Sequence, residues 1–186
     1  MFKHTNLAVV ALGLFLLAPA SLANGDLVSA LAMQNPQLVD SNVLTGGQPS
    51  LDDLSLLKSE GFGVVVNLRT SEEPQGFNEA EEVRQLGMSY IQIPISAPDG
   101  ISRENAQKLH DVLSQTETPV VVHCASGNRV GALFALRAYF IEGLPAESSM
   151  EIGRNAGLTR LEPLVRQIIE TSTQAPDSIE NSTDSP

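Results

Sequence analysis

The sequence of 186 residues contains a single cysteine, Cys124, and no tryptophan. One cysteine cannot form a disulfide within the chain, so we expect the fold to draw its stability from a hydrophobic core. Two explanations for the thiol are open. Cys124 is either an inert buried side chain, which is the commoner fate of a free cysteine, or a residue kept for its chemistry.

Basic residues are also scarce, because 11 lysines and arginines stand against 22 acidic residues, for a net charge of −11. Domains that bind nucleic acid carry basic surfaces, so we expect no nucleic-acid partner. The three histidines, His4, His110 and His123, show no spacing with cysteines or carboxylates that would form a metal site. We therefore expect no metal and no cofactor, and His110 is predicted to lie on the surface of an amphipathic helix.

Long apolar runs are absent, and the clearest one, Leu7 to Leu17, is shorter than the roughly 20 residues of a membrane span. Pro19 follows, and then the small residues Ser21 and Ala23, which is typical of a signal peptide over residues 1–23. No cysteine follows for a lipid anchor. We expect a periplasmic or secreted protein that makes no membrane contact once the signal is removed.

The remaining chain is predicted to form one domain. We interpret residues 24–40 as an N-terminal lead-in, residues 41–171 as the domain, and the polar, acidic residues 172–186 as a disordered tail. No internal repeat and no second domain are visible, and no pattern indicates an oligomeric state.

Apolar runs bounded by glycine or proline alternate with amphipathic stretches, which predicts the α/β class with a central parallel sheet of about four strands flanked by helices. Ser50 and Asp53 have the spacing of a helix N-cap, and Thr159 and Glu162 repeat it. The expected strands are 42–45, 63–69, 88–95 and 119–122; the expected helices are 50–61, 79–86, one beginning at Ser102, 130–142, 146–155 and 159–171.

The segment HCASGNR, residues 123–129, lies between a predicted strand and a predicted helix. Backbone N–H groups at such a turn bind anions, and here they belong to Ala125, Ser126, Gly127 and Asn128. The helix N-terminus and Arg129 both favour a thiolate at the cysteine that opens the loop. Arg129 also offers a planar fork that suits two oxygens of a tetrahedral anion. The loop is therefore a candidate nucleophilic site.

Three further side chains have two interpretations each. His123 either hydrogen-bonds the loop or is only the last residue of a buried strand. Asp99, in the turn Pro98-Asp99-Gly100, is either a general acid or an ordinary turn residue. Arg69, at the end of a predicted strand, is either a second anion contact or, as we favour, the ion-pair partner of Glu72, Glu73 or Asp99.

His123, Cys124, Gly127 and Arg129 match the signature of the cysteine-dependent (dual-specificity and tyrosine) phosphatase superfamily. The blocks GGQPS (46–50), VVVNLR (64–69) and HCASGNRVGAL (123–133) resemble most closely the phosphatase-like domain of bacterial beta-lactamase hydrolase-like proteins. This resemblance covers about residues 40 to 170. It implies a Cys124 nucleophile, stabilisation of the transferred group by Arg129, and Asp99 near the family's general acid.

The loop departs from that pattern in two ways. Four residues separate Cys124 from Arg129 where the phosphatases have five, and Val130 stands where they often have serine or threonine. The form Cys-x-x-Gly-x-Arg resembles rhodanese sulfurtransferases instead, as does the segment LRTSEE (68–73). The leading hypothesis is an exported phosphatase-like hydrolase for a small anionic or phosphorylated substrate. The alternatives are sulfur transfer through a Cys124 persulfide and a non-catalytic anion-binding module.

Overall fold

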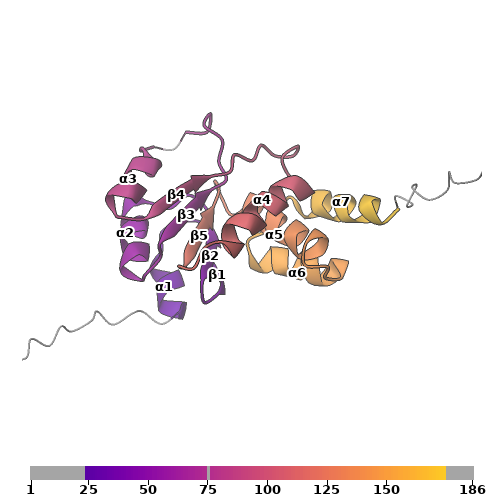
Figure 1. The fold of residues 1–186 in the computed structure, drawn as a ribbon, viewed down its shortest axis with the longest axis horizontal. Helices are drawn as coiled ribbons and strands as arrows, with labels where there is room; N and C mark the ends of the chain where they lie inside the picture. The colour runs from indigo at the N-terminus through magenta and orange to yellow at the C-terminus, as the bar shows by residue number, and fades with distance from the viewer. Residues whose placement is uncertain (1–23, 75, 175–186) are drawn as a thin grey trace, which may run out of the picture.

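The computed structural model describes residues 24–74 and 76–174, which form three layers, with helices on both faces of a five-stranded sheet (Figure 1). The predicted signal peptide lies outside the described residues, as do residues 175–186 of the predicted tail. The elements in chain order are α1 (Asn24–Ala30), β1 (Gln37–Asp40), β2 (Val43–Gly46), α2 (Leu51–Ser59), β3 (Val64–Asn67), α3 (Glu79–Gln85), β4 (Ser89–Gln92), α4 (Arg103–Ser114), β5 (Val120–His123), α5 (Asn128–Phe140), α6 (Ala146–Asn155) and α7 (Glu162–Gln174).

The sheet has the strand order β1-β2-β5-β3-β4, and all neighbouring pairs are parallel except the antiparallel pair of β1 and β2. The predicted α/β class is confirmed, with one strand more than the four expected. The added strand is β1, from the segment 24–40 that we interpreted as a lead-in. Its four residues are only partly buried or exposed, so they lack the apolar alternation by which a strand is recognised.

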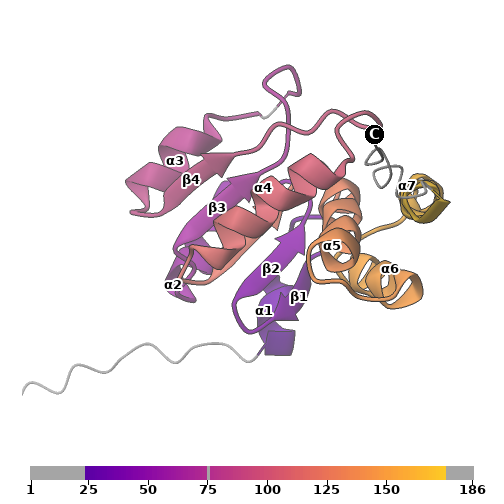
Figure 2. The ribbon, with the colours of Figure 1, turned by 45° about the vertical axis from the view of Figure 1, so that its right-hand side comes forward.

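The two faces of the sheet are covered by different helices, as Figure 2 shows. Successive strand residues point to opposite faces, so Val64 and Val66 pack toward α4 and α5, whereas Val65 packs toward α2 and α3. Leu44 and Val121 pack with Leu27, Leu31 and other residues of the α1 and α2 side. Strands buried on both faces explain the unbroken valine runs of β3 and β5.

Helix α2 begins with the capping box that its sequence predicts. The Asp53 N–H donates to the Ser50 hydroxyl at 3.1 Å, and the Ser50 N–H donates to the Asp53 carboxylate at 2.9 Å. The other Asp53 oxygen accepts the Ala32 N–H at 2.7 Å, which ties the N-terminal segment to this helix.

Helix α7 differs from its prediction at both ends. It begins at Glu162 because the Thr159 hydroxyl, expected to cap it, donates instead to the Asn128 side chain. It ends at Gln174, so residues 172–174, expected in the disordered tail, are helical. Over the described ranges, no helix is both long and apolar enough to cross a membrane.

The parallel strands end at one level on one edge of the sheet. Gly46 pairs with His123, His123 with Asn67, and Asn67 with Gln92. The segments that leave these four strands therefore start side by side. In open α/β sheets this carboxyl edge is where ligands bind.

Candidate active site

Cys124 follows β5 directly, as the sequence predicts, and helix α5 begins four residues later at Asn128, two residues before the expected start at Val130. Gly127 joins the two with φ 88°, a left-handed conformation that a residue with a side chain adopts only under strain. The loop therefore turns sharply into the N-terminus of the helix, where free backbone N–H groups can bind an anion.

Cys124 is 1% exposed, and its sulfur accepts the Gly127 N–H at 3.2 Å. The carbonyls of Ala125 and Ser126 point elsewhere, because they accept the Gln48 N–H and the Asn35 amide. In a planar trans peptide, the N–H of the next residue points opposite to the carbonyl. The N–H groups of Ser126 and Gly127 are thus turned away from these partners, and that of Gly127 reaches the sulfur.

The two glycines of the GGQPS block allow the β2 end to approach this loop closely. A Cβ atom at Gly47 would lie 2.9 Å from the Ala125 carbonyl oxygen, closer than a real Cβ contact. The Cys124 N–H donates to the Gly46 carbonyl at 3.2 Å. The GGQPS block therefore packs against the segment 123–129, which we call the anion loop.

Arg129 is fixed by two partners on the other side of the site. Its NH1 and NH2 groups donate to the two Glu73 oxygens at 2.6 and 2.7 Å, and NH1 also donates to the Ile95 carbonyl at 2.8 Å. The hydrogen bonds that Arg129 donates to Glu73, and to a lesser degree the nearby Cys124 sulfur, raise the pKa of Arg129. A guanidinium has five N–H groups, so Nε–H and one NH2 hydrogen are left for a ligand.

Glu73 also forms an ion pair with Arg69, the arginine at the end of β3. The Arg69 Nε donates to Glu73 at 3.2 Å, which confirms the expected ion pair, and the Thr70 N–H donates at 2.9 Å. The Arg129 hydrogen bond, with those of Thr70 and Arg69, lowers the pKa of Glu73 from 4.5 to about 2. Glu73 is therefore a carboxylate at any physiological pH.

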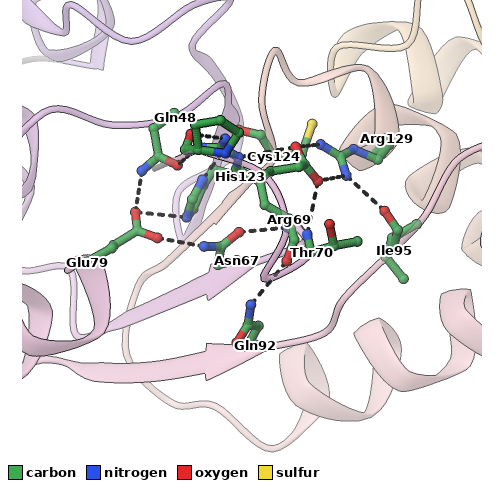
Figure 3. A network of polar contacts seen from close by, with 12 residues as sticks. Gln48, Asn67, Arg69, Thr70, Glu79, Gln92, Ile95, His123, Cys124 and Arg129 are labelled. Carbon is green, nitrogen blue, oxygen red and sulfur yellow. Dashed lines mark hydrogen bonds and ion pairs between the residues drawn. The ribbon is translucent and has the colours of Figure 1, made fainter. Parts of the chain in front are cut away.

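His123 is fully buried, and Figure 3 shows it inside a polar network behind the cysteine. Its Nε2 atom lies 3.1 Å from an oxygen of the buried Glu79, at ion-pair distance but without hydrogen-bond alignment. Its Nδ1 atom lies 3.4 Å from the Cys124 carbonyl oxygen. His123 thus contacts the loop backbone and is also the last residue of a buried strand, so both interpretations describe part of its environment.

The network continues from Glu79 to the arginines. Glu79 accepts hydrogen bonds from the side-chain amides of Gln48 and Asn67, each at 2.7 Å. The side-chain oxygen of Gln48 accepts the NH1 group of Arg69 at 2.6 Å. The side-chain oxygen of Asn67 accepts the backbone N–H of Arg69 at 2.7 Å. One connected set of hydrogen bonds therefore joins the β3 end, α3 and the base of the loop.

A hollow of about 320 Å³ opens over the cysteine. The residues that line it come from the anion loop, the β4–α4 connection and the α6–α7 connection: Ala97, Cys124, Ala125, Ser126, Asn128, Arg129, Arg160 and Leu161. The predicted loop residues Cys124 and Arg129 are thus brought together in one concave site. Arg160 is an addition that the sequence analysis did not contain.

Asp99 does not line this hollow. It is exposed in the turn before α4, two residues after the lining residue Ala97. Its role as a general acid stays a prediction. His110 lies away from the site, where Arg137 donates to its Nδ1 atom at 3.2 Å. Across residues 24–74 and 76–174, no cluster of histidine, cysteine and carboxylate side chains could hold a metal ion.

Sequence reasoning missed Glu73 as the partner of Arg129, and it also missed Glu79, Gln48 and Arg160. Glu73 was considered only as a partner of Arg69. Gln48 and Glu73 both follow strands that end at the carboxyl edge, but this places them only at the same edge and does not identify their partners. Arg160 follows no strand, and no comparable signal marks it.

Comparison with known proteins agrees with this geometry. The family model described as DSP-PTPase phosphatase fused to NAD+ kinase matches residues 18–161. The chain belongs to this phosphatase family. The resemblance to beta-lactamase hydrolase-like proteins is also confirmed, since two such proteins of Xylella fastidiosa are similar to it. That of strain 9a5c is 32% identical over 149 residues, and that of strain Temecula1 is 34% identical over 106.

These two relatives are much longer proteins. The matches cover 73% and 54% of this chain but 33% and 24% of the relatives. Among solved structures, this member of the phosphatase family resembles a DUF442 protein of Shewanella putrefaciens at 20% identity and a TM-score of 0.59, over 79% of this chain and 97% of that one. The catalytic core of a PP-IP phosphatase from S. cerevisiae matches at 20% identity and a TM-score of 0.58, over 74% and 85%. Both likenesses establish the fold.

Proposed function

We propose that this protein is a cysteine-dependent phosphatase that hydrolyses a phosphate ester through the Cys124 thiolate. The observation that carries the proposal is the placement of Arg129. Its guanidinium is held beside the sulfur by Glu73 and Ile95 and keeps two N–H groups for a ligand. A fixed, charged donor next to a nucleophile is what the transfer of an anionic group requires.

In the first step, the Cys124 sulfur attacks phosphorus, so that an S–P bond forms while the P–O bond to the leaving group breaks. The loop N–H groups and Arg129 stabilise the charge on the transferring phosphoryl oxygens. The leaving oxygen takes a proton from a general acid, and Asp99 is the candidate because it follows the lining residue Ala97 by two positions. Water then attacks phosphorus and gives a proton to the carboxylate that the general acid has become, while the S–P bond breaks, which releases phosphate and restores the thiolate.

The length of the anion loop favours one alternative, sulfur transfer through a Cys124 persulfide. Only four residues separate Cys124 from Arg129, and Gly127 is the loop residue whose N–H reaches the sulfur. A small ring of donors also suits a persulfide, so sulfur transfer is the second candidate. Val130, which is fully buried, offers no hydroxyl that would help the thiolate leave.

The setting of this activity is part of the proposal. We infer export to the periplasm or the outside of the cell from the pattern of residues 1–23, and a small phosphorylated substrate from the size of the hollow. A test is to compare the amounts of the protein in periplasmic and cytoplasmic fractions of a bacterium that expresses the full chain.

The deciding experiment compares the protein with its Cys124→Ser variant under reducing conditions. Hydrolysis of para-nitrophenyl phosphate and sulfur transfer from thiosulfate to cyanide are measured side by side. We expect phosphate release from the unchanged protein and a loss of at least 1,000-fold in the variant, since removing a nucleophile removes its whole pathway. Turnover of thiosulfate alone would favour the second candidate, and turnover that does not depend on Cys124 would contradict both.

A further inference from the structure

Arg160 lies at the mouth of the hollow that contains Cys124 and Arg129. It belongs to the connection between α6 and α7, which is distant in sequence from the anion loop. Its side chain is exposed, whereas that of Arg129 is 12% exposed. The hollow therefore has one arginine at its base and a second one at its rim.

The backbone on both sides of Arg160 is tied to the loop. The N–H groups of Thr159 and Leu161 donate to the Asn128 side-chain oxygen at 2.8 and 3.3 Å, and the Thr159 hydroxyl donates to it at 3.2 Å. Asn128 is itself a loop residue and the first residue of α5. One buried amide oxygen thus sets where Arg160 stands relative to the cysteine.

A second contact fixes the same connection. Gly157 has φ 103°, and a Cβ atom there would lie 3.1 Å from the Gly127 carbonyl oxygen. The α6–α7 connection therefore packs directly against the anion loop, and a shift of one would require a shift of the other.

Arg160 is also free to bind a ligand. The neighbouring Arg154 and Arg166 form ion pairs with Glu147 and Glu162. Arg160, by contrast, makes no ion pair and no hydrogen bond with any residue in the part of the chain that the structure describes. In a chain of net charge −11, this cation lines the same hollow as the nucleophile and has no partner among the described residues.

The charges of the other groups in the site indicate which part of a substrate Arg160 could bind. Glu73 neutralises Arg129 and leaves it two N–H groups, which suffice for the oxygens of one phosphoryl group. A second acidic group on the same substrate would find its counter-charge only at the rim. Resting on the proposed function, we propose that Arg160 forms a second anion subsite, which selects phosphate esters that carry a further acidic group.

The test uses two substrates that differ in one charge, 3-carboxyphenyl phosphate and its neutral analogue 3-carbamoylphenyl phosphate. For the unchanged protein we expect a higher kcat/KM for the carboxylate substrate. Arg160→Gln should lower kcat/KM for that substrate about tenfold and leave the neutral one within about twofold, because a charged hydrogen bond is lost in one case only. Arg160→Lys should restore part of the preference.

Lys108→Gln is the matched control. Lys108 is exposed on α4 and does not line the hollow, so its loss changes the net charge equally without touching the site. It should leave the preference for the carboxylate substrate unchanged. The second subsite is refuted if Arg160→Gln lowers kcat/KM equally for both substrates. It is also refuted if Lys108→Gln lowers the preference for the carboxylate substrate as much as Arg160→Gln does. In both cases the phosphatase proposal stands.

A binding measurement separates the two proposals when neither substrate is turned over. Titration calorimetry would compare pyrophosphate with orthophosphate on the unchanged protein, Arg160→Gln and Lys108→Gln. Tighter binding of pyrophosphate that only Arg160→Gln abolishes would support the subsite even though the phosphatase proposal had failed. Equal affinities for the two anions in the unchanged protein would overturn the proposal of a second subsite.

Discussion

At the scale of single residues, the site depends on a carboxylate that does not line the hollow over Cys124. Glu73 binds Arg129 through both oxygens and Arg69 through one, at the end of the polar network behind Cys124. Each arginine has four rotatable side-chain bonds that would otherwise have to be ordered when a ligand arrives. Because Glu73 holds the Arg129 guanidinium through both oxygens, that entropic cost does not fall on binding.

We predict that Glu73→Gln lowers kcat/KM for an aryl phosphate by roughly 10- to 100-fold, because a misplaced catalytic group costs about this much. The free energy of unfolding should fall by about 1–3 kcal/mol, since the amide leaves charged donors without a matching acceptor. Steady-state kinetics and urea unfolding measure the two effects. Glu72→Gln, an exposed neighbour with the same change of charge, is the control and should change neither.

The pH dependence of this stabilisation follows from the pKa of Glu73. Its pKa in the folded protein is about 2, below the ordinary 4.5, so the carboxylate stabilises the fold fully above pH 4.5. The stabilisation is lost as the pH falls through about 2. The difference in Tm between the protein and Glu73→Gln should be constant from pH 7 to pH 5 and shrink below. A difference that grows on acidification would contradict the assigned ion pair.

Cys124 and Arg129 could be predicted as a pair because five positions of one segment fix their relation. The contact of Arg129 with Glu73 could not, since the two residues lie 56 positions apart. Their proximity depends on the pairing of β3 with β5, which no local pattern encodes. Arg160 was missed for a similar reason, because the side chain of Asn128 places it.

At the scale of elements, the start of α2 shows what local patterns do contain. The spacing of Ser50 and Asp53 predicted the capping box, which requires only neighbouring backbone groups. The bond from the Ala32 N–H to Asp53 spans 21 positions and lay outside that prediction. One buried carboxylate therefore both starts a helix and fastens the segment that precedes it.

We predict that Asp53→Ala lowers the free energy of unfolding by about 2 kcal/mol, which combines a lost cap with an unsatisfied buried N–H at Ala32. Urea unfolding followed by circular dichroism would measure it. Asp52→Ala is the matched control, because Asp52 is exposed in the same helical turn and should change the value by less than about 0.5 kcal/mol. Equal losses in the two variants would show that charge at the helix start, and not the capping box, matters.

At the scale of the whole molecule, the boundary expected at residue 41 divides one hydrophobic core. Leu27, Leu31 and Met33 of the segment 24–40 are buried against Leu44 and Val121. The segment also supplies β1, which covers the edge of β2. The sequence did not reveal this because a seven-residue helix and a four-residue strand are too short for a clear apolar period.

We therefore predict different outcomes for two truncated chains. A chain that begins at Asn24 should be soluble and unfold cooperatively, whereas one that begins at Ser41 should aggregate or unfold with a Tm at least 10 °C lower. Burial of three large apolar side chains, at about 1.5–3 kcal/mol each, accounts for the difference. Expression yield, gel filtration and thermal unfolding are the measurements. Equal stability of the two chains would restore the interpretation of residues 24–40 as a lead-in.

The common level at which Gly46, His123, Asn67 and Gln92 end the strands has a consequence for how such a protein can change over evolution. Adding or deleting one residue inside β3 or β5 would turn every later side chain of that strand to the opposite face. The lengths of these strands are therefore constrained. Beyond the common level, the segments 69–78, 96–102 and 156–161 can vary in composition without disturbing that alignment, provided that Glu73 keeps its contact with Arg129 and Gly157 keeps its contact with Gly127. New substrates can thus be acquired by changes in these three segments, while the nucleophile stays where it is.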